Sequence, residues 1–144
     1  MKDESRAVLL DTCAVIWLAN GDPLPREATA RITAAGVAGG ILVSPITAWE
    51  IGMLGRIGSG RSAIQFLPDP KAWLARFMAR PGIRQAAFTP EIAIESSYLP
   101  GDLHSDPADR LIIATARHQQ VPVVTRDRKI IAYGAAGFVD VIPC

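Results

Sequence analysis

The sequence of 144 residues lacks several features that would assign it to a class at once. Two cysteines, Cys13 and Cys144, are too few for a disulfide framework and do not have the spacing of zinc ligands. We therefore expect a reducing, cytoplasmic environment, with Cys13 packed as a small buried thiol. No apolar run approaches the length of a membrane span, and the acid-containing residues 1–6 are unlike a signal peptide, so we expect no membrane association.

Charge of one sign is also lacking, because 15 Lys and Arg residues oppose 14 Asp and Glu residues and leave a net charge of +1. This balance provides no global basic field, so any residues that bind phosphate must be placed locally. The P-loop and GxGxxG signatures are absent, which argues against two common kinds of nucleotide site. Aromatic residues make up only 6% of the chain, and we expect Trp17, Trp49 and Trp73 to lie in the core.

What is present indicates a globular α/β protein. Hydrophobic residues make up 49% and charged residues 20%, and the length suits a single domain spanning residues 1–144. Short runs rich in Val, Ile and Leu alternate with helical stretches, which predicts a mostly parallel sheet covered by helices. We expect strands near 7–10, 41–44, 85–88, 121–125 and 138–142. We expect helices near 12–19, 26–35, 46–56, 70–80, 91–98, 107–119 and 128–133.

Four dipeptides mark the expected starts of helices. Each places a helix-capping side chain directly before proline, which is favoured in the first turn of a helix. The four are Ser44-Pro45, Asp69-Pro70, Thr89-Pro90 and Asp106-Pro107.

Four acids stand at the ends or inside of segments that we expect to be buried. Asp11 ends the first apolar run, and Asp127 follows the fourth. Glu50 is the only charge between Ile41 and Gly55, and Asp109 lies early in the helix expected at 107–119. Because ligands bind at the carboxyl ends of parallel strands, where the strand order reverses, we expect these four side chains to face one cleft.

Converging carboxylates need a partner. A buried carboxylate without one is costly, so it becomes neutral, pairs with a cation or binds a metal. Oxygen ligands suit Mg²⁺ and Mn²⁺, and one or two such ions would support chemistry on a phosphate. Nearby cationic side chains could hold the phosphates of a nucleic acid, namely Arg110, Arg126, Arg128 and Lys129. The loop at 58–61 could contact RNA or a second protomer.

Each acid also has a simpler interpretation. Asp11 and Asp106 could cap helices, and Asp106 is therefore only a secondary candidate for the site, while Asp109 could simply be a favourable acid in the first turn of its helix. Glu50 could pair with Arg56, and Asp127 with its flanking arginines. These alternatives do not explain why all four acids are expected at one edge of one sheet.

The same residues resemble a known family. Val8-Leu9-Leu10-Asp11-Thr12, Trp49-Glu50-Ile51, the run from Asp106 to Ala116, and Val124-Thr125-Arg126-Asp127 look like a PIN-domain protein. Thr89-Pro90-Glu91-Ile92-Ala93 is similar to the VapC-type toxins of bacterial toxin–antitoxin pairs. The resemblance covers residues 7 to 142.

The resemblance implies a three-layer α/β/α fold and an endoribonuclease that depends on Mg²⁺ or Mn²⁺. It places Asp11, Glu50, Asp109 and Asp127 on the family's acidic quartet. Thr125 falls on a frequent hydroxyl near the fourth acid, and Asp106 on an extra acid of the subfamily, while Thr12 follows the first acid. The subfamily's Phe in this loop is replaced by Ala108, and its His is displaced to His104.

The resemblance also implies homodimers and a small antitoxin protein that plugs the site and joins the toxin to operator DNA. Two other classes of protein stay open at this point. A phospho-acceptor receiver domain also carries acids at strand ends, and a PIN fold without catalysis could act only by binding. A nuclease that cuts DNA is a third alternative, since this chemistry does not require a 2′-hydroxyl.

Overall fold

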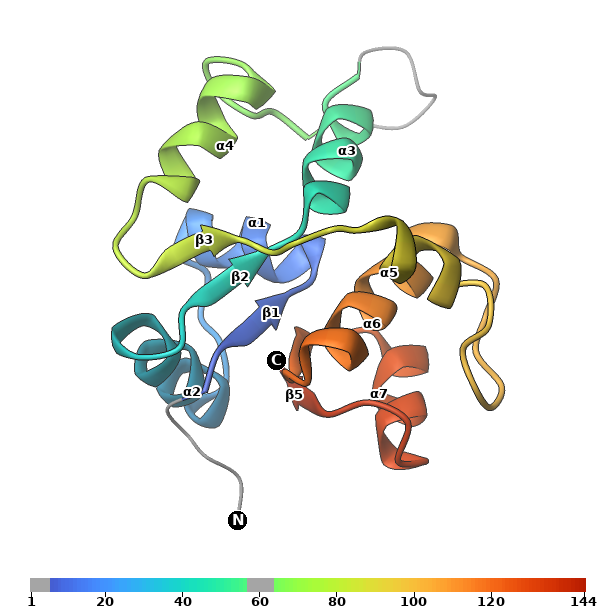
Figure 1. Cartoon of the computed structure of the whole chain (residues 1–144). Helices are drawn as coiled ribbons and strands as arrows, with labels where there is room; N and C mark the ends of the chain where they lie inside the picture. The colour runs from blue at the N-terminus through green and yellow to red at the C-terminus, as the bar shows by residue number, and fades with distance from the viewer. Residues whose placement is uncertain (1–5, 57–63) are drawn as a thin grey trace.

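A five-stranded parallel sheet forms the centre of the computed structural model, which describes residues 6–56 and 64–144 (Figure 1). Its order is β3-β2-β1-β4-β5, and all four neighbouring pairs are parallel. The strands are β1 (Val8–Leu10), β2 (Ile41–Val43), β3 (Ile83–Gln85), β4 (Val123–Thr125) and β5 (Val141–Pro143). The loop expected at 58–61 to contact RNA or a second protomer lies outside the described residues.

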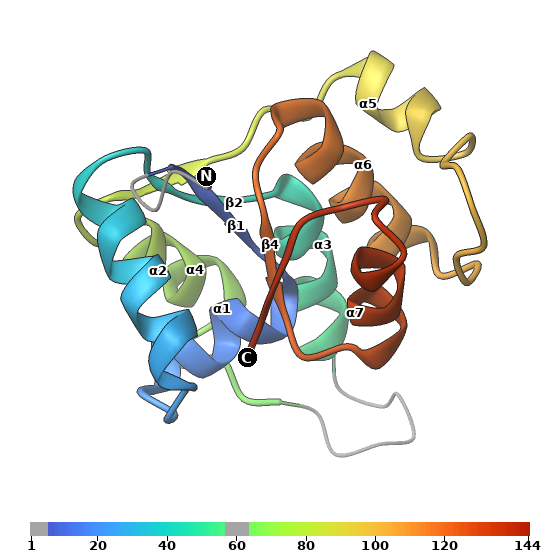
Figure 2. The same ribbon diagram turned by 90° about the horizontal axis from the view of Figure 1, so that it is seen from below.

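Helices cover both faces of this sheet, as the perpendicular view shows (Figure 2). Alternate residues of a strand point to opposite faces, so Val8 and Leu10 pack in one core and Leu9 in the other. The first core is closed by α1 (Thr12–Asn20), α2 (Arg26–Val37) and α4 (Pro70–Met78). The second is closed by α6 (Pro107–Gln119) and α7 (Arg128–Ala135). These layers confirm the predicted three-layer α/β/α fold.

Two further helices lie beside these layers. The helix α3 (Pro45–Leu54) follows β2 and contacts α1 and α6, whereas α5 (Pro90–Glu95) lies against α6. All four predicted helix starts are confirmed, because α3, α4, α5 and α6 begin at the expected prolines. In each case the side chain before the proline accepts a hydrogen bond from a backbone N–H of the first turn.

The sequence placed some boundaries and side chains wrongly. The third strand is Ile83–Gln85 rather than 85–88, because β3 is an edge strand whose Arg84 and Gln85 are exposed. An exposed edge tolerates polar residues, so the apolar run beyond it was misleading. Trp49 lies outside the core at 53% exposure, since α3 is apolar on every side and its composition does not identify the buried face.

The chain order creates a switch point between β1 and β4. From β1 the chain proceeds outward through β2 to β3, and it later returns to β4 on the other side of β1 and continues to β5. The carboxyl ends of β1 and β4 are therefore neighbours, although more than a hundred residues separate them in the sequence. A ligand site is expected at this point of such a sheet. In residues 6–56 and 64–144, no helix combines the length and apolar character needed to cross a membrane.

The position of β3 depends on Gly82, which allows a stability prediction. Gly82 has a φ of +82°, and a Cβ atom there would lie 2.4 Å from the Gly36 carbonyl oxygen of α2. We expect Gly82→Ala to lower the free energy of unfolding by about 1–2 kcal/mol, because alanine disfavours the left-handed backbone conformation of this residue. Displacement of the backbone of α2 should add about 1–3 kcal/mol.

Urea denaturation would measure this effect, with Gly137→Ala as the matched control. Gly137 has a φ of +93°, but a Cβ atom there meets nothing within 4 Å, so only the conformational part of the loss is expected. Equal losses in the two variants would contradict a steric role for Gly82.

Candidate active site at the carboxyl end of the sheet

Asp11 is the most buried acid at the switch point, with 7% of its surface exposed. It follows β1 and caps α1, and its Oδ1 accepts a hydrogen bond from Ala14 N at 2.8 Å. The pKa of its carboxyl is raised to about 6, mainly by burial, and the nearby charges of Asp109 and Asp127 act in the same direction. The hydrogen bonds from Thr125 and Ala14 oppose this shift. Asp11 is thus a cap and a crowded carboxylate at once.

Glu50 is held by hydroxyl groups. Its Oε1 accepts a hydrogen bond from Thr12 Oγ1 at 2.5 Å, and Thr12 Oγ1 lies 3.1 Å from Thr47 Oγ1. Burial raises the pKa of Glu50 above its ordinary value, and Asp109 contributes in the same direction. The partner that the structure gives Glu50 is thus Thr12, from α1, and not the Arg56 considered from the sequence.

Asp109 lies in the first turn of α6 and contacts His104. The Asp109 Oδ2 and His104 Nε2 atoms are 2.6 Å apart, and the Asp109 backbone N–H donates to Asp106 Oδ1 at 3.0 Å. Burial raises the pKa of Asp109, the His104 contact lowers it, and Asp106 raises it. Asp106 is the cap of α6, as its simpler interpretation predicted.

Asp127 begins α7 at the end of β4. Its Oδ1 accepts hydrogen bonds from Lys129 N at 2.8 Å and Ile130 N at 3.3 Å, so backbone N–H groups rather than the flanking arginines orient it. The hydroxyl of Thr125, which is fully buried, accepts a hydrogen bond from Asp127 N at 3.0 Å. Thr125 therefore connects two acids, since it also bonds the Asp11 carboxyl.

All four acids line one cavity, which we call the acidic cleft. Its volume is about 280 Å³, and it is lined by Asp11, Thr12, Cys13, Trp17, Glu50, Asp109, Arg126 and Asp127. A second hollow of about 570 Å³, the outer hollow, shares Asp109 and Asp127 and is otherwise lined by His104, Ser105, Asp106, Arg128 and Lys129. The site thus has an acidic interior with basic side chains on one rim.

A tighter group of potential metal ligands lies where the two hollows meet. His104, Asp109 and Asp127 each offer one ligand atom, and these three atoms lie within 4.8 Å of one another. Carboxylate oxygens are suitable ligands for divalent cations. The sequence had identified both acids but treated His104 as doubtful, because its spacing departs from that of the subfamily.

The four candidate phosphate-binding side chains occupy different surroundings. Arg128 and Lys129 are exposed on the rim of the outer hollow. The Arg126 guanidinium lies over the Trp17 ring, 3.8 Å from its centroid, and donates to the Cys144 carbonyl at 2.9 Å. The Arg110 guanidinium donates to the carbonyls of Ser96, Leu103 and His104, so its donors hold the segment that precedes α6.

Two side chains of the acidic cleft were not recognised from the sequence. Cys13 is exposed rather than buried, and Trp17 is only partly buried. Both point from α1 into the cleft that Asp11 also lines. A spacing of four residues places side chains on the same face of a helix, and this spacing was the available signal. Because Cys13 and Trp17 were both expected in the core, their shared helix face was not considered as part of the site.

The fold and the site together define a class: an α/β/α domain whose acids gather at the switch point of a parallel sheet, with groups suited to a cation. Residues 8–136 match the family model of the PIN domain. The chain therefore belongs to the PIN domain family. This membership is inconsistent with the receiver-domain alternative. The predicted resemblance to PIN-domain proteins is thereby confirmed.

Individual relatives agree with this assignment. Ribonuclease VapC22 of Mycobacterium tuberculosis is 31% identical over 123 residues, which are 85% of this chain and 88% of that protein. The structure of VapBC2 from Rickettsia felis, solved with a DNA fragment from its promoter, matches with a TM-score of 0.66 and 14% sequence identity. The match covers 95% of this chain and 98% of that chain. Mycobacterium tuberculosis VapC20, a toxin that cleaves the sarcin-ricin loop, matches with a TM-score of 0.55 and 21% identity over 94% and 99%.

The raised pKa of Asp11 predicts how stability depends on pH in the metal-free protein. Between about pH 4 and pH 6, the native Asp11 holds a proton that the unfolded chain has lost, so the free energy of unfolding falls as pH rises. We expect Asp11→Asn in EDTA to flatten this fall and to raise the free energy of unfolding at pH 7 by up to about 3 kcal/mol. Asparagine retains a capping side chain.

Urea denaturation at pH 4 and pH 7 would test this prediction. Asp69→Asn is the matched control, because Asp69 caps α4 through Ala72 N at 2.9 Å but is exposed. We expect the control to keep the wild-type slope. An equal pH dependence in wild type and Asp11→Asn would contradict the burial argument.

Proposed function

We propose that this protein is a metal-dependent endoribonuclease and the toxin of a toxin–antitoxin pair. We further propose that it consists of a single PIN-like domain and acts in the cytoplasm. The observation that carries the proposal is the convergence of four carboxylates on one cavity at the switch point of a PIN-family sheet. The likeness to a ribonuclease over 85% of the chain supports RNA as the substrate.

We assign metal binding to Asp11, Glu50, Asp109 and Asp127. The donor set fits Mg²⁺ or Mn²⁺, since these ions favour carboxylate oxygens, and a cation would favour the charged forms of three acids whose pKa is raised by burial and, to a smaller extent, by their mutual repulsion. When bound, one or two such ions would supply Lewis-acid polarisation of the phosphate and a more acidic water. Thr12, Thr125 and Asp106 are secondary members of the site: Thr12 bonds Glu50, Thr125 bonds Asp11, and Asp106 caps the helix that carries Asp109.

The side chains of the site have separate roles in this proposal. Thr12 fixes the Glu50 carboxylate, and Thr125 fixes that of Asp11. The Asp109 carboxylate, whose Oδ2 lies 2.6 Å from His104 Nε2, is placed to accept the proton released by the attacking water, and His104 orients that carboxylate. Because external water attacks rather than the 2′-hydroxyl, we expect products with a 5′-phosphate and a 3′-hydroxyl.

We propose that Arg128 and Lys129 bind RNA phosphates as they approach the acids. Both side chains lie on the rim of the outer hollow, which also contains Asp109 and Asp127. Arg126 can contribute from the acidic cleft, where it covers Trp17. We place Arg110 instead in the support of the loop, because carbonyl oxygens already accept its hydrogen bonds.

The proposed partners are a second copy of this chain and a small antitoxin protein that covers the site. The fold matches that of VapBC2, whose structure was solved with promoter DNA, and this supports an indirect contact of the toxin with DNA through its antitoxin. A PIN fold that binds RNA or antitoxin without catalysis is the alternative function.

The first test is cleavage of end-labelled total RNA by the purified protein with Mg²⁺, with Mn²⁺ and with EDTA. We expect Asp109→Asn to lower the cleavage rate by about 100-fold or more, since losses at residues that only support metal ligands reach 10–100-fold. Asp69→Asn is the matched control, as an Asp-to-Asn change at an exposed cap on α4. Parallel DNA substrates would distinguish an RNase from a nuclease of broader range.

The outcomes separate the alternatives. Cleavage that persists in EDTA or in Asp109→Asn would contradict the assigned site, and 2′,3′-cyclic phosphate ends would contradict attack by water. Specific RNA binding by the wild type with no cleavage under either metal would instead support the binding module.

A second prediction concerns the basic rim. On the Asp109→Asn background, where the RNA stays intact, we expect Arg128→Ala and Lys129→Ala each to weaken RNA binding. Each should also lower the slope of log Kd against log salt by about 0.7, the value for one phosphate contact to a single strand. Filter binding at several salt concentrations would measure both. Lys71→Ala, at an exposed position on α4, should leave the slope unchanged, and an unchanged slope in all three variants would contradict the assignment.

A further inference from the structure

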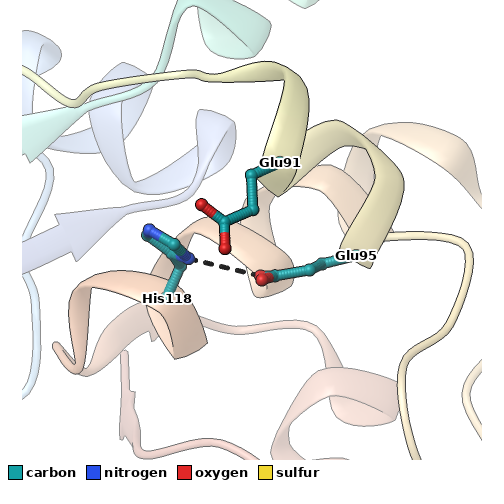
Figure 3. Close-up of side chains that lie close together, drawn as sticks. All are labelled: Glu91, Glu95 and His118. Atoms are coloured by element: carbon teal, nitrogen blue, oxygen red, sulfur yellow. Dashed lines mark ion pairs between the residues drawn. The ribbon is translucent and has the colours of Figure 1, made fainter.

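A second group of potential metal ligands lies between α5 and α6, outside the acidic cleft. Glu91 and Glu95 are one turn apart on α5, and His118 is in the last turn of α6. Figure 3 shows the three side chains turned toward a common space between the two helices. Each of them offers one ligand atom, and these atoms lie within 4.8 Å of one another.

The separations are close to those of a bound ion. Zinc lies about 2.0–2.2 Å from nitrogen and oxygen ligands, so two ligands of one ion are at most about 4.4 Å apart. The His118 Nδ1 and Glu95 Oε2 atoms, at 3.4 Å, already satisfy this limit. Glu91 and His118 are exposed and Glu95 is half-buried, so small side-chain rotations suffice to bring the set together.

The electrostatics of α5 favour a cation at this point. Like charges four residues apart on a helix repel each other, and a negative charge at the carboxyl end of a helix opposes its dipole. Glu95 experiences both effects, because it is the last residue of α5 and one turn from Glu91. The ion pair between His118 and Glu95 explains the position of Glu95. It does not explain why the Glu91 carboxylate also turns toward the same space.

We propose that Glu91, Glu95 and His118 bind one divalent transition-metal ion, with Zn²⁺ as the probe. One imidazole nitrogen and two carboxylate oxygens suit Zn²⁺, whereas Mg²⁺ prefers oxygen ligands and retains its waters. His118 lies nine residues beyond Asp109 on α6, which is about 13 Å along the helix axis. The site is therefore separate from the acidic cleft and uses different ligand chemistry.

The proposed ion has a structural role. It joins α5, a helix of only six residues, to the carboxyl-terminal turn of α6. The segment between these helices contains His104, which contacts Asp109, and its carbonyls accept hydrogen bonds from Arg110. Metal binding would thus stabilise the segment that forms one wall of the outer hollow, without supplying a ligand to the reacting phosphate.

Calorimetric titration with Zn²⁺ tests the proposal, on an Asp109→Asn background that removes the group formed with His104 and Asp127. We expect one equivalent of Zn²⁺ to bind, and His118→Ala to weaken this binding by about 10–100-fold or more. Glu95→Gln should act in the same direction. His104→Ala is the matched control, because it removes the other histidine of the chain, and it should leave the affinity unchanged.

Two further measurements make the outcome decisive. The visible spectrum of bound Co²⁺ should be lost in His118→Ala, and a thiolate-to-metal absorption band would instead assign the ion to Cys13 or Cys144. Zn²⁺ should raise the Tm of the background variant but not that of the variant that also carries His118→Ala. Absence of binding at millimolar Zn²⁺, or an affinity that His118→Ala does not change, would overturn the proposal while leaving the RNase proposal untouched.

Discussion

The burial of several carboxylates at the switch point, where they also repel one another, is the constraint on which the rest of the site depends. The strand order makes β1 and β4 neighbours, and the backbone bond from Asp11 N to the Val124 carbonyl, at 3.1 Å, brings the residues after both strands together. Burial then disfavours the charged form of Asp11, and the nearby Asp109 and Asp127 disfavour it further. The hydroxyl and backbone N–H donors around these acids offset only part of this penalty. A divalent cation bound by these oxygens would relieve the remainder.

Helix capping and ligand binding, which the sequence presented as alternatives, are compatible because a carboxylate has two oxygens. Asp11 accepts the N–H of Ala14 with Oδ1, and Asp127 accepts two N–H groups with its own Oδ1. In both residues, the capping bonds fix the direction of the side chain and use only Oδ1, so capping does not occupy the second oxygen. Capping therefore restricts the conformations of these side chains before any ligand arrives, which lowers the entropy lost on binding. The acids that begin helices at strand ends are suited to both roles for the same structural reason.

Local signals predicted more of this molecule than non-local ones did. The helix starts at Pro45, Pro70, Pro90 and Pro107 followed from capping chemistry that involves only adjacent residues, and the structure has all four. The edge strand β3 was misplaced because its exposure depends on the strand order, which no single segment encodes. The contact between His104 and Asp109 was missed for a similar reason, since the conformation of its loop depends on Arg110. Trp17 was assigned to the core, because the apolar character of its helix outweighed the four-residue spacing from Cys13 that places both side chains on the face lining the cleft.

The partners of the acids also explain why their charge remains available. Glu50 is positioned by the Thr12 hydroxyl, with Thr47 behind it, and a neutral donor orients a carboxylate without cancelling its charge. Two arginines beside the site are directed elsewhere: Arg126 covers the indole of Trp17 and bonds a carbonyl, and Arg110 bonds three carbonyls. An arginine paired with one of these acids would lower its pKa and compete with a metal for the same oxygens. The carbonyls and the indole that engage the arginines therefore contribute to the site indirectly, because they keep these cations from neutralising the cleft.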